Sequence, residues 1–499
     1  MKNYAFSLFT ACLALFATSA PATTFFVNAN NSAPVAPYTN WLTAATNIQD
    51  AIDAAFASGT VVVSNGLYQT GARYMLNGST NRVAVTKPLA LQSVNGAAVT
   101  VIDGSNAVRC LYLTNHVSVT GFTLRNGLAA NGGGVFCQGD DVLNDCALIG
   151  NSSPYDWTSG GGAYGGILNR CTFTGNSASY LGAAAVYAGL NFCVVSNNGP
   201  AAYGGAGLQC GMINCLIVSN TAAWGGGVVN CEADNCLLLG NSALYGGGGA
   251  IWSTLNSCTV VGNTAGTGPG TYGGAGVYDG TANNCIIYYN NGDNCTADWE
   301  GISLNHSCST PNPGGIGTIT NAPLFVSLAG GDFHLQTNSP CINSGNNSYV
   351  TLTNDFDGNP RIRGDTVDIG AYEYQTPTSV ISYAWLQQYG LTNNGSADFA
   401  DADGDGFNNW NEWRAGTSPT DPSSLLKMTT VINDVYGITV TWQSVSGITY
   451  FLQRGTNLAA PSAFSTIQTN IVGQPDTTSY TDTDAVGSGP FFYRVGVQQ

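Results

Sequence analysis

Charged side chains are scarce in this sequence: they make up 8% of its 499 residues, against roughly a quarter in ordinary soluble proteins. The shortage is greatest for basic residues, since 13 Lys and Arg stand against 29 Asp and Glu, for a formal net charge of −16. A chain with a negative net charge repels the phosphates of a nucleic acid, so we expect no nucleic-acid partner. Low charge combined with 44% hydrophobic residues also excludes a charge-driven disordered chain.

Long apolar runs are absent outside the N-terminus, so the mature chain is not expected to span a membrane. At the N-terminus, Lys2 precedes the apolar stretch 5–17, and Ala20-Pro21-Ala22 resembles a cleavage site. This pattern predicts a signal peptide over residues 1–22, and hence a secreted or cell-surface protein. A buried first helix, or a lipoprotein signal ending at Cys12, are the alternatives.

No C-x-x-C pair accompanies the 15 cysteines, which argues against a zinc site. Seven of the cysteines recur instead at intervals of 21 to 27 residues, and each is followed five residues later by an asparagine. The cysteines are Cys146, Cys171, Cys193, Cys215, Cys236, Cys258 and Cys285, and the asparagines are Asn151, Asn176, Asn198, Asn220, Asn241, Asn263 and Asn290.

A unit of about 22 residues, with short β-favouring runs and no helical periodicity, is typical of a parallel β-helix. Coils stacked at about 4.8 Å would place the asparagines within hydrogen-bonding distance of one another, as a structural ladder. The cysteines would fill the core as small buried hydrophobes. Because their Cβ vectors would be parallel, we expect them to stay reduced. Cys295 and Cys308 lie in irregular sequence, where a disulfide between them is an option.

The N-terminal order of a strand at Phe25-Phe26-Val27, an amphipathic helix at 47–56 and further strands, together with VTGFTLRNG at 119–127, resembles the pectin-lyase-like superfamily. The Gly-Gly units, such as Gly273-Gly274-Ala275-Gly276-Val277, are similar to the repeats of chlamydial polymorphic outer-membrane proteins. These resemblances imply a right-handed parallel β-helix with a capping helix at its open end. Segments 322–326 and 355–375 resemble exported β-helix proteins of the choice-of-anchor Q kind, so we place the β-helix at residues 23–375.

A linker with a candidate calcium loop follows at residues 376–424. The sequence from Asp401 to Glu412 matches D-x-[DN]-x-[DN]-G-x5-E at every specified position. The expected ligands of one calcium ion are Asp401, Asp403, Asp405, the Phe407 carbonyl, Asn409 through a water, and Glu412. The segment resembles thrombospondin type 3 or dockerin-like calcium segments more than an EF-hand.

Residues 425–499 alternate apolar and polar side chains in GITVTWQSV, TYFLQRG and PFFYRVGV, the period of half-buried strands. The stretch resembles a fibronectin type III domain. We therefore predict an all-β chain: a β-helix, a small calcium-binding segment and a C-terminal β-sandwich.

Catalytic groups are hard to find. Lyases of the pectin-lyase-like superfamily use Arg or Lys as the base. Between residues 126 and 360 this chain offers one such side chain, Arg170, with His306 and His334 near the end of the range. Asp140 and Asp141 are interpreted as turn residues. Glu232 and Asp234 are a weaker candidate for the carboxylate pair of an inverting hydrolase.

A column of aromatic residues precedes the glycine corners: Tyr180, Tyr203, Trp224, Tyr245 and Tyr272, which Trp157 and Tyr155 would extend. Stacked rings of this kind either stabilise the coils or bind carbohydrate. The sequence thus favours an exported calcium-binding β-helix protein that acts as a carbohydrate- or surface-binding, adhesin-like module. The alternatives are a polysaccharide lyase or glycoside hydrolase, and a purely structural surface protein.

Overall fold

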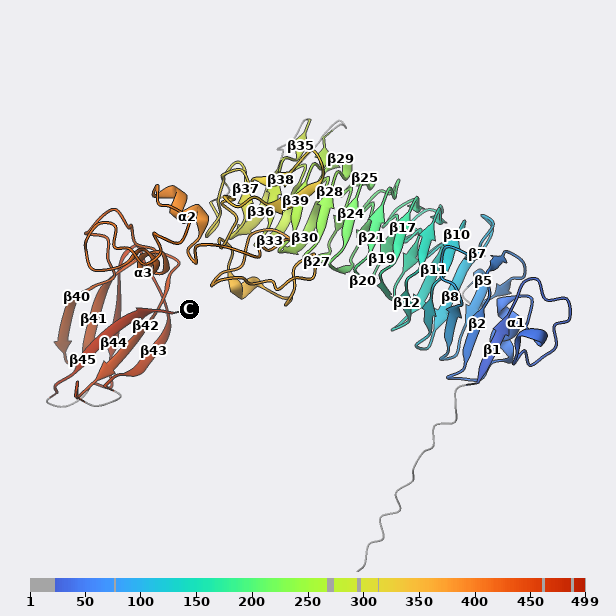
Figure 1. Cartoon of the computed structure of the whole chain (residues 1–499), viewed down its shortest axis with the longest axis horizontal. Helices are drawn as coiled ribbons and strands as arrows, with labels where there is room; N and C mark the ends of the chain where they lie inside the picture. Colours follow the sequence, from blue (N-terminus) through green and yellow to red (C-terminus); the bar gives the residue numbers. More distant parts are fainter. Residues whose placement is uncertain are drawn as a thin grey trace, which may run out of the picture.

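The computed structural model describes residues 23–75, 78–266, 273–293, 298–312, 314–459, 463–485 and 489–498. The predicted signal peptide, Tyr272 and Cys295 lie outside these ranges. Figure 1 shows a long stack of coils and, beyond its C-terminal end, a separate body of antiparallel strands. The predicted all-β architecture, a parallel β-helix followed by a β-sandwich, is confirmed. None of the helices in the described ranges is long and apolar enough to cross a membrane.

Each coil contributes strands to three parallel walls. The first wall contains β5 (Thr80–Val85), β8 (Arg109–Thr114), β11 (Val135–Gln138), β15 (Ala163–Tyr164), β19 (Ala185–Val186), β22 (Gly207–Leu208) and β26 (Val228–Val229). The second contains β1 (Thr24–Val27), β2 (Thr60–Val63), β6 (Ala90–Ser93), β9 (Ser118–Thr120), β12 (Val142–Asn144), β16 (Ile167–Asn169), β20 (Gly189–Asn191), β23 (Gly211–Ile213) and β27 (Glu232–Asp234). Both walls continue into the long strands β30 (Ala250–Asn256), β33 (Val277–Asn283) and β36 (Trp299–Asn305).

The third wall is an eleven-stranded sheet. Its strands are β3 (Gly66–Tyr68), β7 (Thr100–Asp103), β10 (Thr123–Arg125), β13 (Ala147–Ile149), β17 (Thr172–Thr174), β21 (Val194–Ser196), β24 (Leu216–Val218), β28 (Leu237–Leu239), β31 (Thr259–Val261), β34 (Ile286–Tyr288) and β37 (Cys308–Ser309). Short strands at the remaining corner are β14 (Ser152–Ser153), β18 (Ser177–Ala178), β25 (Thr221–Trp224), β29 (Ser242–Gly246), β32 (Thr264–Ala265) and β35 (Asn291–Gly292). β4 (Arg73–Tyr74) pairs antiparallel with β5.

The asparagine ladder is confirmed as structural. All seven asparagines are buried. In the first six, the Nδ2 and the backbone N–H donate to the Oδ1 of the asparagine on the next coil, at 2.8–3.0 Å. Because each Nδ2 also donates to a backbone carbonyl, as Asn220 does to Val195 at 2.8 Å, the side chain joins three coils. A buried amide satisfied in this way fixes the stacking of the coils.

The seven column cysteines are buried free thiols, as predicted. The backbone N–H of Cys215 donates to the Sγ of Cys236 at 3.4 Å, and Cys236 repeats the contact with Cys258. The bridge considered between Cys295 and Cys308 stays a prediction. Cys295 lies outside the described residues, and Cys308 is a free thiol that donates to the Asn321 carbonyl at 3.2 Å.

The glycine pairs are required where the chain enters the first wall. Gly225 has φ +63°, and a Cβ there would lie 2.2 Å from Cγ2 of Val229 on the outer face of the wall. A Cβ on Gly226 would meet the Ser242 carbonyl oxygen of the next coil at 2.3 Å. The first glycine thus makes room for an outward apolar side chain, and the second lets two coils approach.

The N-terminal end of the β-helix is closed as the sequence predicts. Helix α1 (Ile48–Ala54) begins after the N-cap Asn47, whose side chain accepts from the Asp50 N–H at 2.8 Å. Its residues Ile48 and Ile52 are buried in the same core cluster as Phe25 of β1. A short 3-10 helix (Trp41–Thr43) precedes it. Figure 1 shows α1 at the end of the stack, where it covers the first coil.

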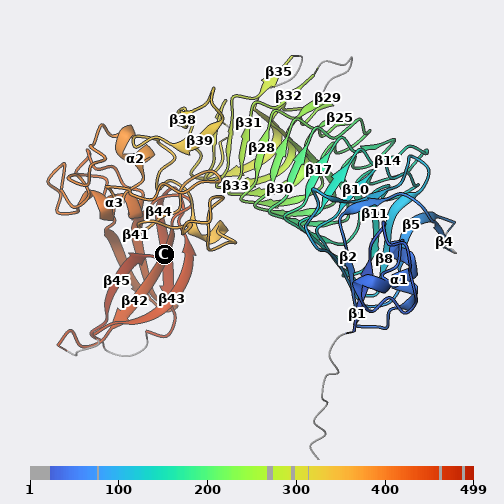
Figure 2. The ribbon, with the colours of Figure 1, turned by 45° about the vertical axis from the view of Figure 1, so that its right-hand side comes forward.

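Beyond β37 the chain no longer coils but folds back over the outside of the third wall. We call residues 322–375 the cap; it contains β38 (Phe325–Ser327), β39 (Asp332–Leu335) and the 3-10 helix Asn347–Tyr349. Figure 2 shows β38 and β39 beside the late coils. Phe325, Phe333 and Ile369 of the cap share a buried core with outward side chains of the third wall, among them Val261 and Ile286.

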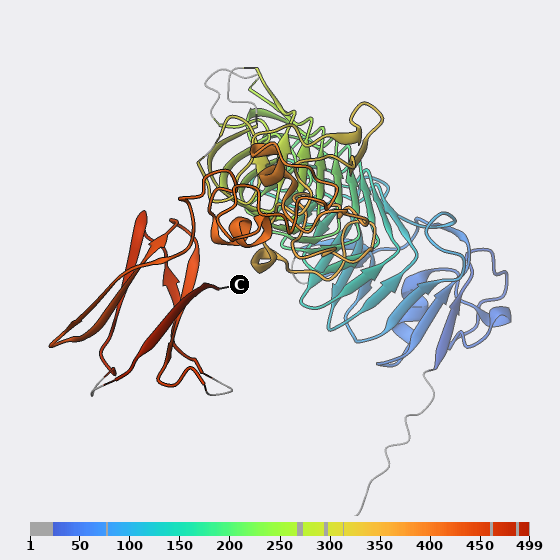
Figure 3. The ribbon, with the colours of Figure 1, turned by 60° about the vertical axis from the view of Figure 1, so that its left-hand side comes forward.

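The C-terminal part starts with α2 (Tyr383–Gln388) and α3 (Asn409–Ala415). Two three-stranded antiparallel sheets follow: β40 (Met428–Asp434), β41 (Gly437–Ser444) and β44 (Asp476–Asp482), and β42 (Thr449–Gly455), β43 (Ser465–Val472) and β45 (Phe492–Val497). Trp442 and Tyr450 are buried between them. Figure 3 shows this sandwich standing apart from the stack of coils.

Candidate metal centre and aromatic surface

The loop from Asp401 to Glu412 brings its acidic side chains together. Carboxylate oxygens of Asp401, Asp403 and Asp405 all lie within 4.8 Å of one another. The loop is shaped by its own backbone: Asp401 Oδ1 accepts from the Gly404 N–H at 2.7 Å, and Asp401 Oδ2 from the Gly406 N–H at 2.9 Å.

Helix α3 supplies the remaining groups. Its N-cap is Asn408, whose side chain accepts from the Asn411 N–H, so that Asn409 and Glu412 fall in the first turn and are buried. Phe407 precedes the cap, and its N–H donates to Asp405 Oδ1 at 2.7 Å. The three aspartates of the predicted site therefore lie together, and Asn409 and Glu412 are buried in the first turn of the helix that follows them.

Several oxygens of this cluster are buried without any hydrogen-bond partner: Asp403 Oδ2, Asp405 Oδ2, Asn409 Oδ1, Glu412 Oε1 and Glu412 Oε2. Such atoms are costly to bury unpaired. With the Phe407 carbonyl and Asp401 they make up a set of six to eight oxygen ligands, which is the set that calcium takes. The residues present therefore fit a calcium ion.

The electrostatics agree with this fit. Glu412 is 1% exposed. Burial, together with the charges of Asp403, Asp405 and Asp401, raises the pKa of Glu412 to about 7. A divalent cation would remove that repulsion.

The loop is held against the rest of the segment by a small core of its own. Ile381, Leu386 and Ala397 are buried there, with Trp410 and Trp413 of α3 packed against them. Asp398 accepts from Ser379 Oγ at 2.6 Å, and Trp410 Nε1 donates to Asp365 of the cap at 3.2 Å. The loop is therefore tied to the end of the β-helix.

The predicted aromatic column is present in part. The Trp157 and Tyr180 rings lie 4.6 Å apart, those of Tyr180 and Tyr203 5.8 Å, and those of Trp224 and Tyr245 5.1 Å. The fifth member, Tyr272, lies outside the described residues. The four described members, Tyr180, Tyr203, Trp224 and Tyr245, are half-buried, so each keeps part of its ring accessible.

A second column, which the sequence did not reveal, runs along the outer face of the first wall. Strand register aligns Tyr112, Phe136, Tyr164, Val186, Leu208, Val229, Ile251 and Tyr278. We call this set the outer column. Tyr112, Phe136 and Tyr164 stack with centroids 5.6 and 5.2 Å apart, and Arg109 lies 5.3 Å over the Phe136 ring.

The two columns meet. Tyr203 and Trp224 pack against the buried aliphatic members of the outer column, Val186, Leu208, Val229 and Ile251. The rings therefore contribute to packing, while their exposed parts, with Tyr187 and Trp252 at 50% exposure nearby, leave an apolar surface along the stack.

Of the remaining candidates for catalysis, Asp140 and Glu232 are exposed, whereas Asp141 and Asp234 are engaged in hydrogen bonds that join segments of the structure. Asp141 is fully buried, with its two oxygens accepting from the N–H groups of Val117 and Gln138, at 2.8 and 3.1 Å. Asp234 Oδ1 accepts from Asn256 Nδ2 at 2.9 Å and from Thr351 Oγ1 of the cap at 3.1 Å. Neither Asp141 nor Asp234 is poised as a free acid or base.

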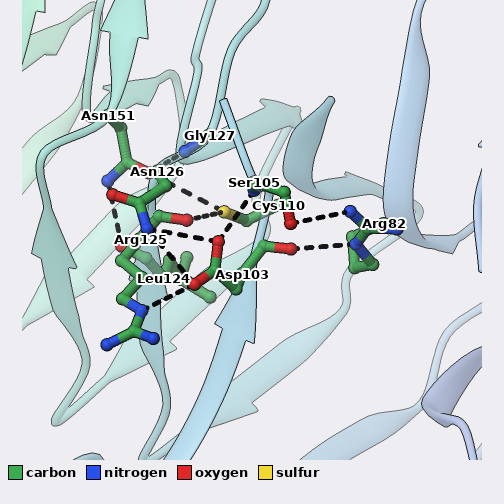
Figure 4. A network of polar contacts seen from close by, with 9 residues as sticks. All are labelled: Arg82, Asp103, Ser105, Cys110, Leu124, Arg125, Asn126, Gly127 and Asn151. Atoms are coloured by element: carbon green, nitrogen blue, oxygen red, sulfur yellow. Dashed lines mark hydrogen bonds and ion pairs between the residues drawn. The ribbon is translucent and has the colours of Figure 1, made fainter. Parts of the chain in front are cut away.

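Basic side chains gather in the N-terminal coils, in the polar network of Figure 4. Asp103 accepts from Arg125 Nε at 2.7 Å and from Asn126 Nδ2 at 3.2 Å, and its backbone carbonyl accepts from Arg82 Nε at 2.9 Å. Burial works to raise the pKa of Asp103, but the hydrogen bonds from Arg125, the Ser105 N–H and Asn126 outweigh it, and the pKa is lowered. The network holds successive coils together.

Comparison with known proteins gives no family: no protein-family model matches the chain, and neither does any curated protein. Among solved structures, pectate lyase Pel9A is 14% identical, with a TM-score of 0.44 over 70% of this chain and 96% of that chain. A rhamnogalacturonan lyase is 11% identical, with a TM-score of 0.35 over 62% and 91%. The A-module of the Azotobacter vinelandii mannuronan C-5 epimerase AlgE4 is 17% identical, with a TM-score of 0.28 over 55% and 92%. At these values the likenesses say nothing about activity.

Proposed function

We propose that this protein is an exported, calcium-binding β-helix protein that binds carbohydrate at the cell surface or outside the cell, as an adhesin-like module. The observation that carries the calcium part is the group of buried, unpartnered oxygens on Asp403, Asp405, Asn409 and Glu412. A bound calcium ion satisfies all of them at once.

The ion would have a structural role. The loop lies in chain order between the cap and the sandwich, and Trp410 already links it to Asp365. Calcium held by Glu412 of α3 and by the aspartates of the loop would fix α3 relative to the cap. Magnesium, which requires a smaller octahedron, would bind less well.

Calorimetric titration of the full chain with calcium and with magnesium tests this part. One calcium ion per chain, weak magnesium binding and loss of binding in Asp405→Ala are expected. Asp421→Asn is the matched control, because Asp421 is an exposed carboxylate of the same segment outside the loop. No heat of calcium binding to the full chain, or unchanged binding in Asp405→Ala, refutes the site.

The carbohydrate part rests on the aromatic surface. Ring faces offer contact area to sugar rings, and the half-buried rings of Tyr180, Tyr203, Trp224 and Tyr245 repeat from coil to coil as the residues of a glycan do. A glycan array tests for binding. Assays for reducing ends and for unsaturated products, on the glycans that bind, separate a binding protein from a lyase or hydrolase.

A further inference from the structure

Cys308 does not belong to the thiol column inside the β-helix. Strand β37 pairs with β34 so that Cys308 lies beside Ile286 and Ser309 beside Ile287. Ile287 faces the interior core, whereas Ile286 belongs to the core beneath the cap. Cys308 therefore points outward from the last strand of the third wall, and Ser307 takes the next position of the thiol column, where its Oγ accepts from the Cys285 N–H at 3.0 Å.

Cys341 comes from the cap and meets Cys308 from the opposite side. Its carbonyl accepts from the Ile369 N–H at 3.0 Å, and its own N–H donates to Ser339 Oγ at 3.2 Å, so its backbone is fixed within the cap. Both cysteines are 0% exposed and share one core cluster. Burial and the neighbouring Cys341 side chain both raise the pKa of Cys308, so the two side chains lie close to each other in this core.

This geometry differs from that of the interior column. There, each thiol lies under the backbone of a neighbouring coil, and the side chains leave their strands in parallel, which is unsuitable for bridging. Cys308 and Cys341 instead project towards each other from two facing layers. A disulfide requires side chains that approach each other in this way rather than in parallel.

We propose that Cys308 and Cys341 form a disulfide that fastens the cap to the last coil of the β-helix. The two thiols lose two protons and two electrons as the S–S bond forms. A disulfide oxidant, such as oxidised glutathione, takes up the electrons and is reduced to two thiols. The bond closes a chain segment that includes β38 and β39.

The bond should form during folding rather than afterwards. Burial raises the pKa of Cys308 well above its ordinary value, and the thiolate is the reacting species. Once the cap has docked, both sulfurs are out of reach of a soluble oxidant. Oxidation therefore has to be tested by refolding in the presence of the oxidant.

The full chain is refolded with oxidised and reduced glutathione, blocked with an alkylating reagent, denatured and mapped without reduction. Trypsin is unsuitable, because no Lys or Arg lies between Arg170 and Arg361. Pepsin cleaves at apolar residues such as Phe325 and Phe333, which separates the two cysteines. The expected result is one linked pair of peptides holding Cys308 and Cys341, with the interior column cysteines unlinked.

Variants make the test independent of peptide recovery. Cys308→Ser, Cys341→Ser and the double variant should lose the same number of degrees in Tm under oxidising conditions, because all three lack the same bond. Under reducing conditions the Tm of the parent should fall most of the way to that of the three variants. Cys285→Ser, which alters the interior column, should change the Tm by the same amount under oxidising and reducing conditions. Free Cys308 and Cys341 after oxidative refolding, or Cys308 linked to Cys295, would overturn the proposal without affecting the calcium or carbohydrate proposals.

Discussion

Asp298 ends the asparagine ladder by accepting both hydrogen bonds of Asn290. Its Oδ1 lies 3.0 Å from the backbone nitrogen and 3.0 Å from the Nδ2 of Asn290, in the place where the next coil would present an amide oxygen. Asp298 Oδ2 accepts from Thr310 Oγ1 at 2.9 Å. A carboxylate needs no further acceptor, so the ladder stops here without leaving a buried donor unpaired.

The first prediction concerns the middle of the ladder. Asn220→Ala removes the Oδ1 that accepts from the N–H and the Nδ2 of Asn198. It also removes the Nδ2 that donates to the Val195 carbonyl and to Asn241. We expect a loss of unfolding free energy of roughly 1 to 3 kcal/mol for each buried group left unpaired. Chemical denaturation measures it.

Asn191→Ala is the control for this prediction. Asn191 also stacks on an asparagine of the neighbouring coil, with its Nδ2 2.9 Å from Asn169 Oδ1, but it is partly exposed. Water can replace its contacts, so its loss should be clearly smaller. Equal losses for the two variants would contradict the structural role of the buried ladder.

The second prediction uses two glycines of neighbouring coils. In Gly226→Ala the new Cβ would lie 2.3 to 2.6 Å from backbone atoms of Ser242, which cannot move without separating two coils, and we expect a cost of at least about 1–3 kcal/mol. In Gly211→Ala nothing lies within 4 Å of the new Cβ, so stability should be unchanged or slightly higher. Thermal melts that rank these variants the other way would refute the role of the corner.

Local repeats explain why so much of the β-helix could be predicted. The five-residue offset between a column cysteine and its asparagine, as between Cys215 and Asn220, lies within one coil and repeats in the next coil. The ladder, the thiol column and the glycine corners could therefore be predicted from the sequence. The calcium loop is equally local, since all six expected ligands lie within twelve residues.

Contacts between distant segments could not be predicted in this way. Tyr164 lies seven residues before Cys171, as the later members of the outer column lie before their cysteines, but Tyr112 and Phe136 do not share this offset. Strand register aligns those two with the rest of the column. Cys308 follows Cys285 by 23 residues, which looks like another member of the column. A shift of one residue puts Ser307 inside and Cys308 outside, because adjacent residues of a strand face opposite sides.

The third prediction concerns His334 in the cap. Its Nδ1 lies 2.6 Å from Asp332 and its Nε2 2.7 Å from Asp357, and its ring lies 4.1 Å from that of Tyr372. Burial favours the neutral imidazole, but the hydrogen bonds to Asp357 and Asp332 outweigh it, and the pKa of His334 is raised.

Because the pKa of His334 is raised in the folded protein, protonated His334 stabilises the folded state. This stabilisation is complete below the ordinary histidine pKa of about 6.5 and is lost as the pH rises through the pKa of the folded protein. Compared with His334→Gln, the parent should therefore have its largest Tm advantage in mild acid and lose it in mild base. The effect should be small because the side chain is 46% exposed. A Tm difference that grows with rising pH would show that the sign is wrong.

The fourth prediction concerns glycan binding. Trp224→Ala should weaken binding of any glycan that the array identifies, because the ring of Trp224 is partly exposed beside that of Tyr245. Phe192→Ala is the control: this ring is 58% exposed on a nearby coil, but at the corner between the second and third walls. Affinity that falls equally in both variants, or in neither, would remove the aromatic column as the binding surface.

The last prediction separates the two effects of the acidic loop. Glu412→Gln removes one buried negative charge from a cluster of carboxylates that repel one another, so the calcium-free protein should become no less stable and its segment no easier to cleave. The same change removes a carboxylate that would hold the ion, so calcium should no longer protect the segment. In the parent, calcium at 100 times its dissociation constant should stabilise the segment by about 2.7 kcal/mol.

Cleavage by chymotrypsin measures this protection directly, because Phe399 is 67% exposed just before the loop. Calcium should slow cleavage there in the parent and in Asp421→Asn, but not in Glu412→Gln. Equal protection of Glu412→Gln by calcium would show that the ion, if bound, does not use this loop.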